Sequence, residues 1–195
     1  MQNELPTRKP TRLRNFDYSS KGAYFVTICT QGRKQLLSAI EKPDRVTAQG
    51  GATLDTVGEG LAPPARSPST LLVGEGLAPP ALKLLPCGEI AKEQLLLLEK
   101  RYPFLTVEKF VIMPDHIHFI LFLHQKTGGA SPSPTLHDVV CAFKSLTSRL
   151  CKQRYGVEKI FQRSCAEHII RDREDYDTHI KYMYENPLRW YYNHR

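Results

Sequence analysis

The sequence predicts an α+β fold, in which a ferredoxin-like antiparallel sheet of element order βαββαβ is followed by an added C-terminal helix. Segments rich in β-branched and aromatic residues predict four strands, over 23–29, 106–113, 116–123 and 166–171. Apolar residues at helical spacing predict helices between these strands, over 90–101 and 135–155. A third helix is predicted to start near Asp172, with Pro187 as its expected end.

The middle two strands are predicted to form a hairpin, because Pro114 and Asp115 supply a turn between them. The helix over 135–155 has one apolar face. Its opposite face is polar and basic, and it carries Lys144, Ser148, Arg149, Lys152 and Arg154. The last helix begins with Glu174 and Asp175, whose negative charges suit the positive end of the helix dipole.

The chain has 195 residues, which is enough for a hydrophobic core, and we expect a single domain over 1–195. No apolar run approaches the roughly 20 residues of a membrane span. Residues 1–15 are polar and basic, and they lack the apolar segment of a secretory signal. The five cysteines form no CxxC pair, so we expect reduced, mostly buried thiols in a cytoplasmic protein.

The formal net charge is +7 and the isoelectric point is about 9.2. An excess of positive charge favours a polyanionic partner, because phosphate contacts release condensed counterions. A basic arm that includes Arg12 and Arg14 precedes the first strand and is suited to following phosphates, although a disordered terminus has the same composition. Charge alone is equally compatible with a basic protein that binds no nucleic acid.

Residues 41–85 differ in composition from the rest of the chain. The nine-residue sequence 57–65, Val-Gly-Glu-Gly-Leu-Ala-Pro-Pro-Ala, recurs without change as 73–81. Two copies are too few for a solenoid, and the richness in Gly, Pro, Ala and Ser predicts a flexible insertion within the domain. We expect that a repetitive element inserted in frame and that removal of residues 45–82 leaves folding intact.

His116 and His118 are the first residues whose spacing suggests chemistry. Side chains two apart on a strand share a face, so the two imidazoles can reach one metal ion. This pattern is weak evidence by itself, because paired histidines on an apolar strand are more often packing residues.

The last helix strengthens the case for a site. Tyr182 and Asn186 are one turn apart on the same side, next to the predicted core face. A phenol and an amide oxygen can thus face the histidine pair. A metal held by two imidazole nitrogens and an amide oxygen keeps positions for a phosphate oxygen, and it would act on the phosphate as a Lewis acid. A tyrosine nucleophile would conserve the energy of the broken phosphodiester bond in a phosphotyrosine ester. Spacing alone does not choose between Tyr182 and Tyr184, Tyr191 or Tyr192.

Several motifs outside the insertion occur together in this chain. They are Asp17-Tyr-Ser19, Gly22-Ala-Tyr-Phe-Val-Thr-Ile28, Val111-Ile-Met-Pro-Asp-His-Ile-His118, Phe143-Lys-Ser145, Phe161-Gln-Arg-Ser164, Glu167-His-Ile-Ile-Arg171 and Tyr182-Met-Tyr-Glu-Asn-Pro187. In this combination the chain resembles the HUH tyrosine transposases of the IS200-like group, and most closely the REP-associated tyrosine transposases. The resemblance spans nearly the whole chain except residues 41–85.

The resemblance implies a role for each matching position. His116 and His118 correspond to the metal-binding pair, Asn186 to the third metal ligand and Tyr182 to the catalytic nucleophile. It further implies Mg²⁺ or Mn²⁺ as cofactor, single-stranded or hairpin DNA from palindromic repeats as substrate, a 5′-phosphotyrosine intermediate and a role in DNA transposition. We expect a monomer or homodimer that associates with the nucleoid. Candidate DNA contacts are Arg12, Arg14, Lys144, Arg149, Lys152, His168 and His179.

Three other readings remain open from the sequence. A ferredoxin-like sheet with exposed aromatic residues also suits an RNA- or DNA-binding module of the RNA-recognition type, without catalysis. A small metallohydrolase would use water as nucleophile and form no covalent intermediate. A degenerate copy would be inactive, although each predicted site position holds a suitable residue.

Overall fold

The computed structural model describes residues 20–41, 81–124 and 134–194 of the chain. A four-stranded sheet forms its centre, and its strands are β1 (Gly22–Cys29), β4 (Leu105–Ile112), β5 (His116–Leu123) and β6 (Ala166–Ile170). The order across the sheet is β4-β5-β1-β6, and every neighbouring pair is antiparallel. This is the strand order of a ferredoxin-like sheet, so the predicted α+β fold is confirmed.

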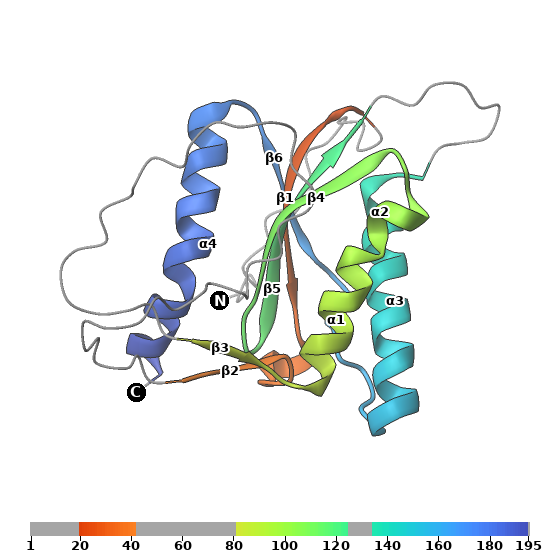
Figure 1. Cartoon of the computed structure of the whole chain (residues 1–195), viewed down its shortest axis with the longest axis vertical. Coiled ribbons are helices and arrows are strands. Elements are labelled where there is room, and N and C mark those ends of the chain that lie inside the picture. The colour runs from red at the N-terminus through yellow and green to blue at the C-terminus, as the bar shows by residue number, and fades with distance from the viewer. Residues whose placement is uncertain (1–19, 42–80, 125–133, 195) are drawn as a thin grey trace, which may run out of the picture.

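The helices cover both faces of this sheet. They are α1 (Pro86–Leu96), α2 (Leu98–Arg101), α3 (Leu136–Tyr155) and α4 (Arg173–Asn193). In Figure 1, α1 and α3 lie together on one side of the sheet, and α4 lies on the other. The sheet is therefore the middle layer of three, and its two faces have different neighbours.

Strand β5 shows how the sequence divides residues between these faces. Ile117, Phe119, Leu121 and Leu123 belong to a large apolar cluster that also contains the buried side chains of α1 and α3. The alternate residues of β5, from His116 to Phe122, point to the α4 side because successive side chains of a strand alternate. The smaller cluster on that side contains Ile120 and Met183. The larger core thus lies between the sheet and the α1–α3 layer.

The first predicted helix differs in its limits from those observed, and the second closely matches. The helix expected over 90–101 begins earlier, at Pro86, whose ring suits the first helical position. It is divided into α1 and α2 at Leu97. The helix α3 closely matches its prediction: Thr135 and Asp138 form a capping box at its start, and Gly156 ends it with a positive φ of 68°.

The prediction that α4 ends at Pro187 is wrong, because the helix continues to Asn193 with Pro187 inside it. A proline removes one helical hydrogen bond but does not prevent the following turns when these gain packing. Here Pro187 is buried, and Trp190 packs against the smaller apolar cluster. Asp172 caps the start of α4 by accepting a hydrogen bond of 2.9 Å from the main-chain N–H of Asp175.

The limits of the predicted insertion also change. Strand β2 (Ser38–Ile40) pairs antiparallel with β3 (Leu82–Leu84), so the last residues of the 41–85 segment are an ordered strand. Pairing between three-residue strands on either side of a long segment leaves no local sequence signal. The first repeat copy, 57–65, lies outside the described residues, as does the second copy, 73–81, except for its last residue. The single-domain assignment with a flexible insertion stays a prediction.

The cysteines are less buried than expected. Cys87 and Cys151 are buried, Cys29 and Cys165 are half-buried, and Cys141 is exposed on α3. The described part of the chain contains no helix that is both long enough and apolar enough to cross a membrane.

Candidate active site

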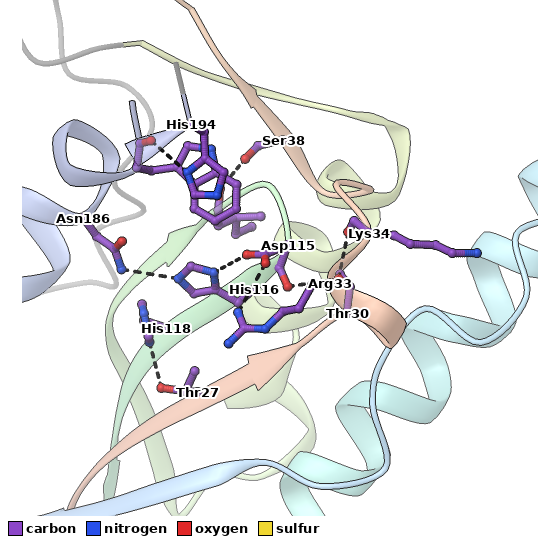
Figure 2. Close-up of polar contacts among 12 residues, drawn as sticks. Thr27, Thr30, Arg33, Lys34, Ser38, Asp115, His116, His118, Asn186 and His194 are labelled. Atoms are coloured by element: carbon purple, nitrogen blue, oxygen red, sulfur yellow. Dashed lines mark hydrogen bonds and ion pairs between the residues drawn. The ribbon is translucent and has the colours of Figure 1, made fainter. Parts of the chain in front are cut away.

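The histidine pair of β5 lies beneath α4, on the smaller-core side of the sheet. His116 is 7% exposed and His118 is 4% exposed, so both rings are largely withdrawn from water. Their ring centroids are 4.6 Å apart. The prediction that the two imidazoles share one face of a strand is confirmed by this geometry (Figure 2).

Each ring is oriented through its Nδ1 atom. His118 Nδ1 is 2.8 Å from the hydroxyl of Thr27, its cross-strand partner on β1. The Nδ1–H of His116 donates to Oδ1 of Asp115, and the guanidinium of Arg33 donates to the other carboxylate oxygen over 3.3 Å. The Asp115 carboxylate can only accept, so it fixes the Nδ1–H tautomer of His116 and leaves the Nε2 lone pair free, whereas the Thr27 hydroxyl orients the ring of His118 as either donor or acceptor.

The two Nε2 atoms have the surroundings expected of metal ligands. His118 Nε2 is buried, and no hydrogen-bond partner for it exists among the described residues. His116 Nε2 is 3.3 Å from the side-chain amide nitrogen of Asn186 (Figure 2). The nitrogen and oxygen of such an amide are interchangeable by a flip, so the amide oxygen can occupy this position. A buried nitrogen without a partner costs about 1–3 kcal/mol, which a ligand would recover. The residues present therefore fit a divalent cation.

Burial also keeps both imidazoles neutral. Removal from water lowers the pKa of His118 to about 3, and the positive charge of Arg33 adds to this shift. Burial lowers the pKa of His116 as well, while the neighbouring carboxylate of Asp115 opposes that shift. A neutral imidazole is the form that coordinates a metal, so neither ring needs to lose a proton at neutral pH.

Tyr182 projects from α4 beside this pair. Its ring lies edge-on to His118 with centroids 5.2 Å apart, and edge-on to Phe25 at 6.3 Å. The side chain is 39% exposed, so the phenol remains accessible to a large substrate. Asn186 lies one turn later on the same helix and is buried. The helix thus brings Tyr182 and Asn186 to the histidine pair. Tyr184, two residues after Tyr182, is more exposed, at 50%.

Among the described residues, the basic side chains predicted to bind DNA do not gather at this point. Arg12 and Arg14 lie outside the described residues. Lys144, Arg149 and Lys152 are on α3, which covers the opposite face of the sheet. Lys144 donates to the main-chain oxygen of Arg163 over 2.8 Å, and Lys152 pairs with Glu158 at 2.6 Å. Their proposed DNA contacts stay predictions.

His168 and His179 form a separate group beside the candidate site. Their rings stack with centroids 4.6 Å apart, and Asp175 lies between the nitrogens of both. The ring of His179 also packs on Phe25 at 4.5 Å, and Phe25 in turn stacks on His118 at 5.1 Å. His179 therefore borders the site through Phe25.

Sequence reasoning missed three supporting residues. Asp115 and Thr27 orient the histidines, and Trp190 lies 6.0 Å from the ring of His116. The adjacency of Asp115 to His116 was a usable signal. Thr27 and Trp190 reach the site only through strand pairing and through a helix that continues past Pro187, which no local pattern indicates.

Two proteins of Haemophilus influenzae and one solved structure resemble this chain. No protein-family model matches the chain. A protein of Haemophilus influenzae without a described function is 23% identical over 94% of this chain and 89% of its own length. A second H. influenzae protein, provisionally named a REP-associated tyrosine transposase, is 31% identical over 46% of this chain, and the chain spans about half of that protein, 53%. A solved structure of a REP-associated tyrosine transposase bound to a REP hairpin superposes with a TM-score of 0.52, at 19% identity, over 91% of this chain and 73% of that one.

The resemblance to REP-associated tyrosine transposases is confirmed. At 19% identity the structural match establishes a shared fold, and this agrees with the α+β sheet and added C-terminal helix expected from the predicted order of elements.

Proposed function

We propose that this protein is a transposase-like, DNA-binding enzyme that nicks and rejoins single-stranded DNA through a covalent tyrosine intermediate. Two comparisons support the broad class: the partial sequence match to a provisionally named REP-associated tyrosine transposase, and the shared fold with one that was solved bound to a REP hairpin. We propose single-stranded or hairpin DNA from palindromic repeats as the substrate.

One observation carries the proposal more than the others. The phenol ring of Tyr182 packs against His118, whose buried Nε2 has no hydrogen-bond partner among the described residues. A candidate nucleophile and a candidate metal ligand thus lie side by side. His116, His118 and Asn186 would hold Mg²⁺ or Mn²⁺. When bound there, the cation supplies Lewis acidity to a phosphate oxygen.

The proposed reaction exchanges one phosphorus–oxygen ester bond for another. The oxygen of Tyr182 attacks the phosphorus and forms a P–O bond, while the bond from phosphorus to the 3′ oxygen of the departing strand breaks. The phenol proton is released, and the departing 3′ oxygen takes up a proton. The DNA 5′ phosphate remains on Tyr182 until a 3′ hydroxyl reverses the exchange. The ester conserves the bond, so rejoining needs no nucleotide cofactor.

A binding module of the RNA-recognition type is less well supported. Such modules stack bases on aromatic residues exposed on the sheet. In this chain α4 covers one face of the sheet. Phe25, the aromatic residue that β1 presents to α4, is 8% exposed. The opposite face is covered by α1 and α3. A base could stack on this sheet only after α4 moved away.

The test uses variants of two tyrosines that lie two residues apart on α4. Full-length protein is incubated with Mn²⁺ and end-labelled single-stranded oligonucleotides from repeats that flank its gene, and cleavage is followed on denaturing gels. We expect Tyr182→Phe to abolish cleavage and retain binding. Tyr184→Phe, an exposed tyrosine on the same helix, is the matched control and should cleave like the wild type.

Other outcomes would identify the rival functions. Unchanged cleavage by Tyr182→Phe would refute the role of this residue as nucleophile. Cleavage by the wild type without any protein–DNA adduct would indicate a metallohydrolase that uses water. Binding without cleavage by the wild type, at any Mn²⁺ concentration, would indicate a binding module or a degenerate copy.

A further inference from the structure

Three potential metal ligands meet where the edge strand β6 joins the first two turns of α4. His168 lies on β6, and Asp175 and His179 lie on α4. His168 Nε2 is 2.9 and 3.0 Å from the two carboxylate oxygens of Asp175. His179 Nδ1 is 3.1 Å from the same carboxylate. One ligand atom from each residue lies within 4.8 Å of the other two.

This spacing suits a small cation. Two ligands at tetrahedral angles on zinc, with bonds of about 2.0–2.1 Å, stand roughly 3.3 Å apart. The nitrogen-to-carboxylate distances here are close to that value. His179 Nδ1 also lies 2.8 Å from the main-chain oxygen of Asp175, so this ring would exchange that hydrogen bond for the ion. The group is also reachable from solvent, because the side chains of His168, Asp175 and His179 are 45%, 21% and 18% exposed.

We propose that His168, Asp175 and His179 form a second metal site, which binds a divalent transition metal of the zinc class. Two imidazole nitrogens and one carboxylate oxygen are a ligand set for Zn²⁺, Co²⁺ or Ni²⁺, whereas Mg²⁺ prefers oxygen ligands. The site is distinct from the histidine pair of β5. The ring of Phe25 stands between the two, with centroids 4.5 Å from His179 and 5.1 Å from His118.

The position of this site indicates its effect. The ion would tie strand β6 to the beginning of α4, and His179 lies one turn before Tyr182 on that helix. Among the described residues, those that α4 buries are Met183, Asn186 and Pro187, from the middle of the helix onward, whereas the first half packs with the partly buried Tyr176 and Ile180. Its first half therefore has less apolar packing to hold it on the sheet. Metal binding there would anchor the half of the helix that leads into Tyr182.

The test counts ions bound to the full-length, untagged protein. Wild type is stripped with EDTA and titrated with Co²⁺, and bound cobalt per chain is measured by elemental analysis together with the visible spectrum. We expect His168→Gln to lose one bound ion relative to wild type. His118→Gln should keep that ion, which separates the second site from the proposed catalytic one.

Cys141→Ser is the matched control. His137 and Cys141 are another exposed pair, with a sulfur-to-nitrogen distance of 3.4 Å, and they could bind cobalt adventitiously. We expect this variant to bind as many ions as the wild type at the second site. Zn²⁺ should raise the melting temperature of wild type and His118→Gln, and it should raise that of His168→Gln by less than that of wild type, because only the site on β5 remains in this variant.

His179→Gln provides a second variant in case His168→Gln does not fold. Loss of the same ion in whichever variant folds supports the site. Wild-type cobalt content and an unchanged spectrum in the folded variant would overturn it, and would mean that Asp175 only accepts hydrogen bonds from two histidines.

Discussion

The two faces of strand β5 differ in chemistry, because one is apolar and the other carries the histidine pair. Toward α1 and α3, the strand presents Ile117, Phe119 and Leu121, each fully buried in the larger apolar cluster. Toward α4, it presents His116 and His118, which are equally withdrawn from water but polar, and are held by hydrogen bonds. Residues adjacent in sequence thus serve opposite faces.

This division lets one strand supply both stability and chemistry. Burying polar rings is unfavourable unless they are satisfied. The Nε2 of His118, which has no hydrogen-bond partner in the described part of the chain, is tolerated because the opposite face supplies a large apolar core. Substitutions on the α1–α3 face should therefore change stability, and substitutions on the α4 face should change metal binding and catalysis.

The largest effect on stability is expected from Phe119→Ala. This side chain is fully buried and packs against Phe143 of α3 with ring centroids 6.1 Å apart. Its removal should lower the free energy of unfolding by about 3–5 kcal/mol. Urea denaturation of both proteins measures the difference. Mn²⁺ affinity of the folded fraction should remain that of the wild type; a parallel loss of affinity would contradict the separation of the two faces.

The complementary change is His118→Ala, one residue earlier on the other face. We expect Mn²⁺ binding, measured by calorimetry, to weaken by at least about 100-fold, equivalent to roughly 3 kcal/mol. The free energy of unfolding without metal should fall by less than in Phe119→Ala, because the variant also removes an unsatisfied buried nitrogen. Unaltered Mn²⁺ affinity would show that this histidine is a packing residue.

A pH dependence should appear in the protein without metal. The pKa of His118 is lowered to about 3 in the folded state, whereas an unfolded histidine titrates near 6.5. The unfolded chain therefore takes up a proton first as pH falls, so the stability present above pH 6.5 is progressively lost toward pH 3. Between pH 6.5 and 5 the loss should be roughly 2 kcal/mol.

The measurement is urea denaturation in EDTA at pH 7 and pH 5, for wild type and His118→Ala. The variant should lose less stability than the wild type over this interval, and His116, whose pKa is also lowered, should account for part of the remaining slope. Equal slopes in the two proteins would mean that His118 is not held neutral by burial.

A smaller effect is expected from Asp115→Asn. The amide oxygen can still accept from His116, but the negative charge that faces Arg33 is lost. Partners of metal-binding histidines typically affect affinity by about 10- to 100-fold, and we expect the lower end here because an acceptor remains. Mn²⁺ calorimetry measures the change. Arg33→Gln is the matched control, and it should weaken binding less because Arg33 acts on His116 through the Asp115 carboxylate, to which its guanidinium donates.

The sequence allowed much of the fold to be predicted. The strand β5 and the helix α3 were found, since the apolar, β-branched and aromatic content of β5 and the amphipathic pattern of α3 are local properties. The β2–β3 pair was missed because its partners are distant in sequence. The extension of α4 past Pro187 was missed because tertiary packing of Trp190 outweighs a local helix-breaking signal.

The candidate site was predicted in its main residues and not in its support. The two-residue spacing of the histidines and the four-residue spacing of Tyr182 and Asn186 each define a shared face, and the fold brings those faces together. Thr27 and Asp175 gain their roles only through contacts between separate elements. Contacts of this kind have no periodic trace in the sequence.

The most direct test of the central claim is the identity of the residue that carries DNA. Wild type is incubated with Mn²⁺ and a repeat-derived single-stranded hairpin, the adduct is trapped by denaturation, and the protein is digested with trypsin and nuclease. Cleavage after Lys181 and Arg189 releases a peptide that contains both Tyr182 and Tyr184, and fragmentation in the mass spectrometer separates them. We predict a nucleotide phosphate on Tyr182. A nucleotide on Tyr184, or DNA cleavage without a modified peptide, would contradict the proposed mechanism.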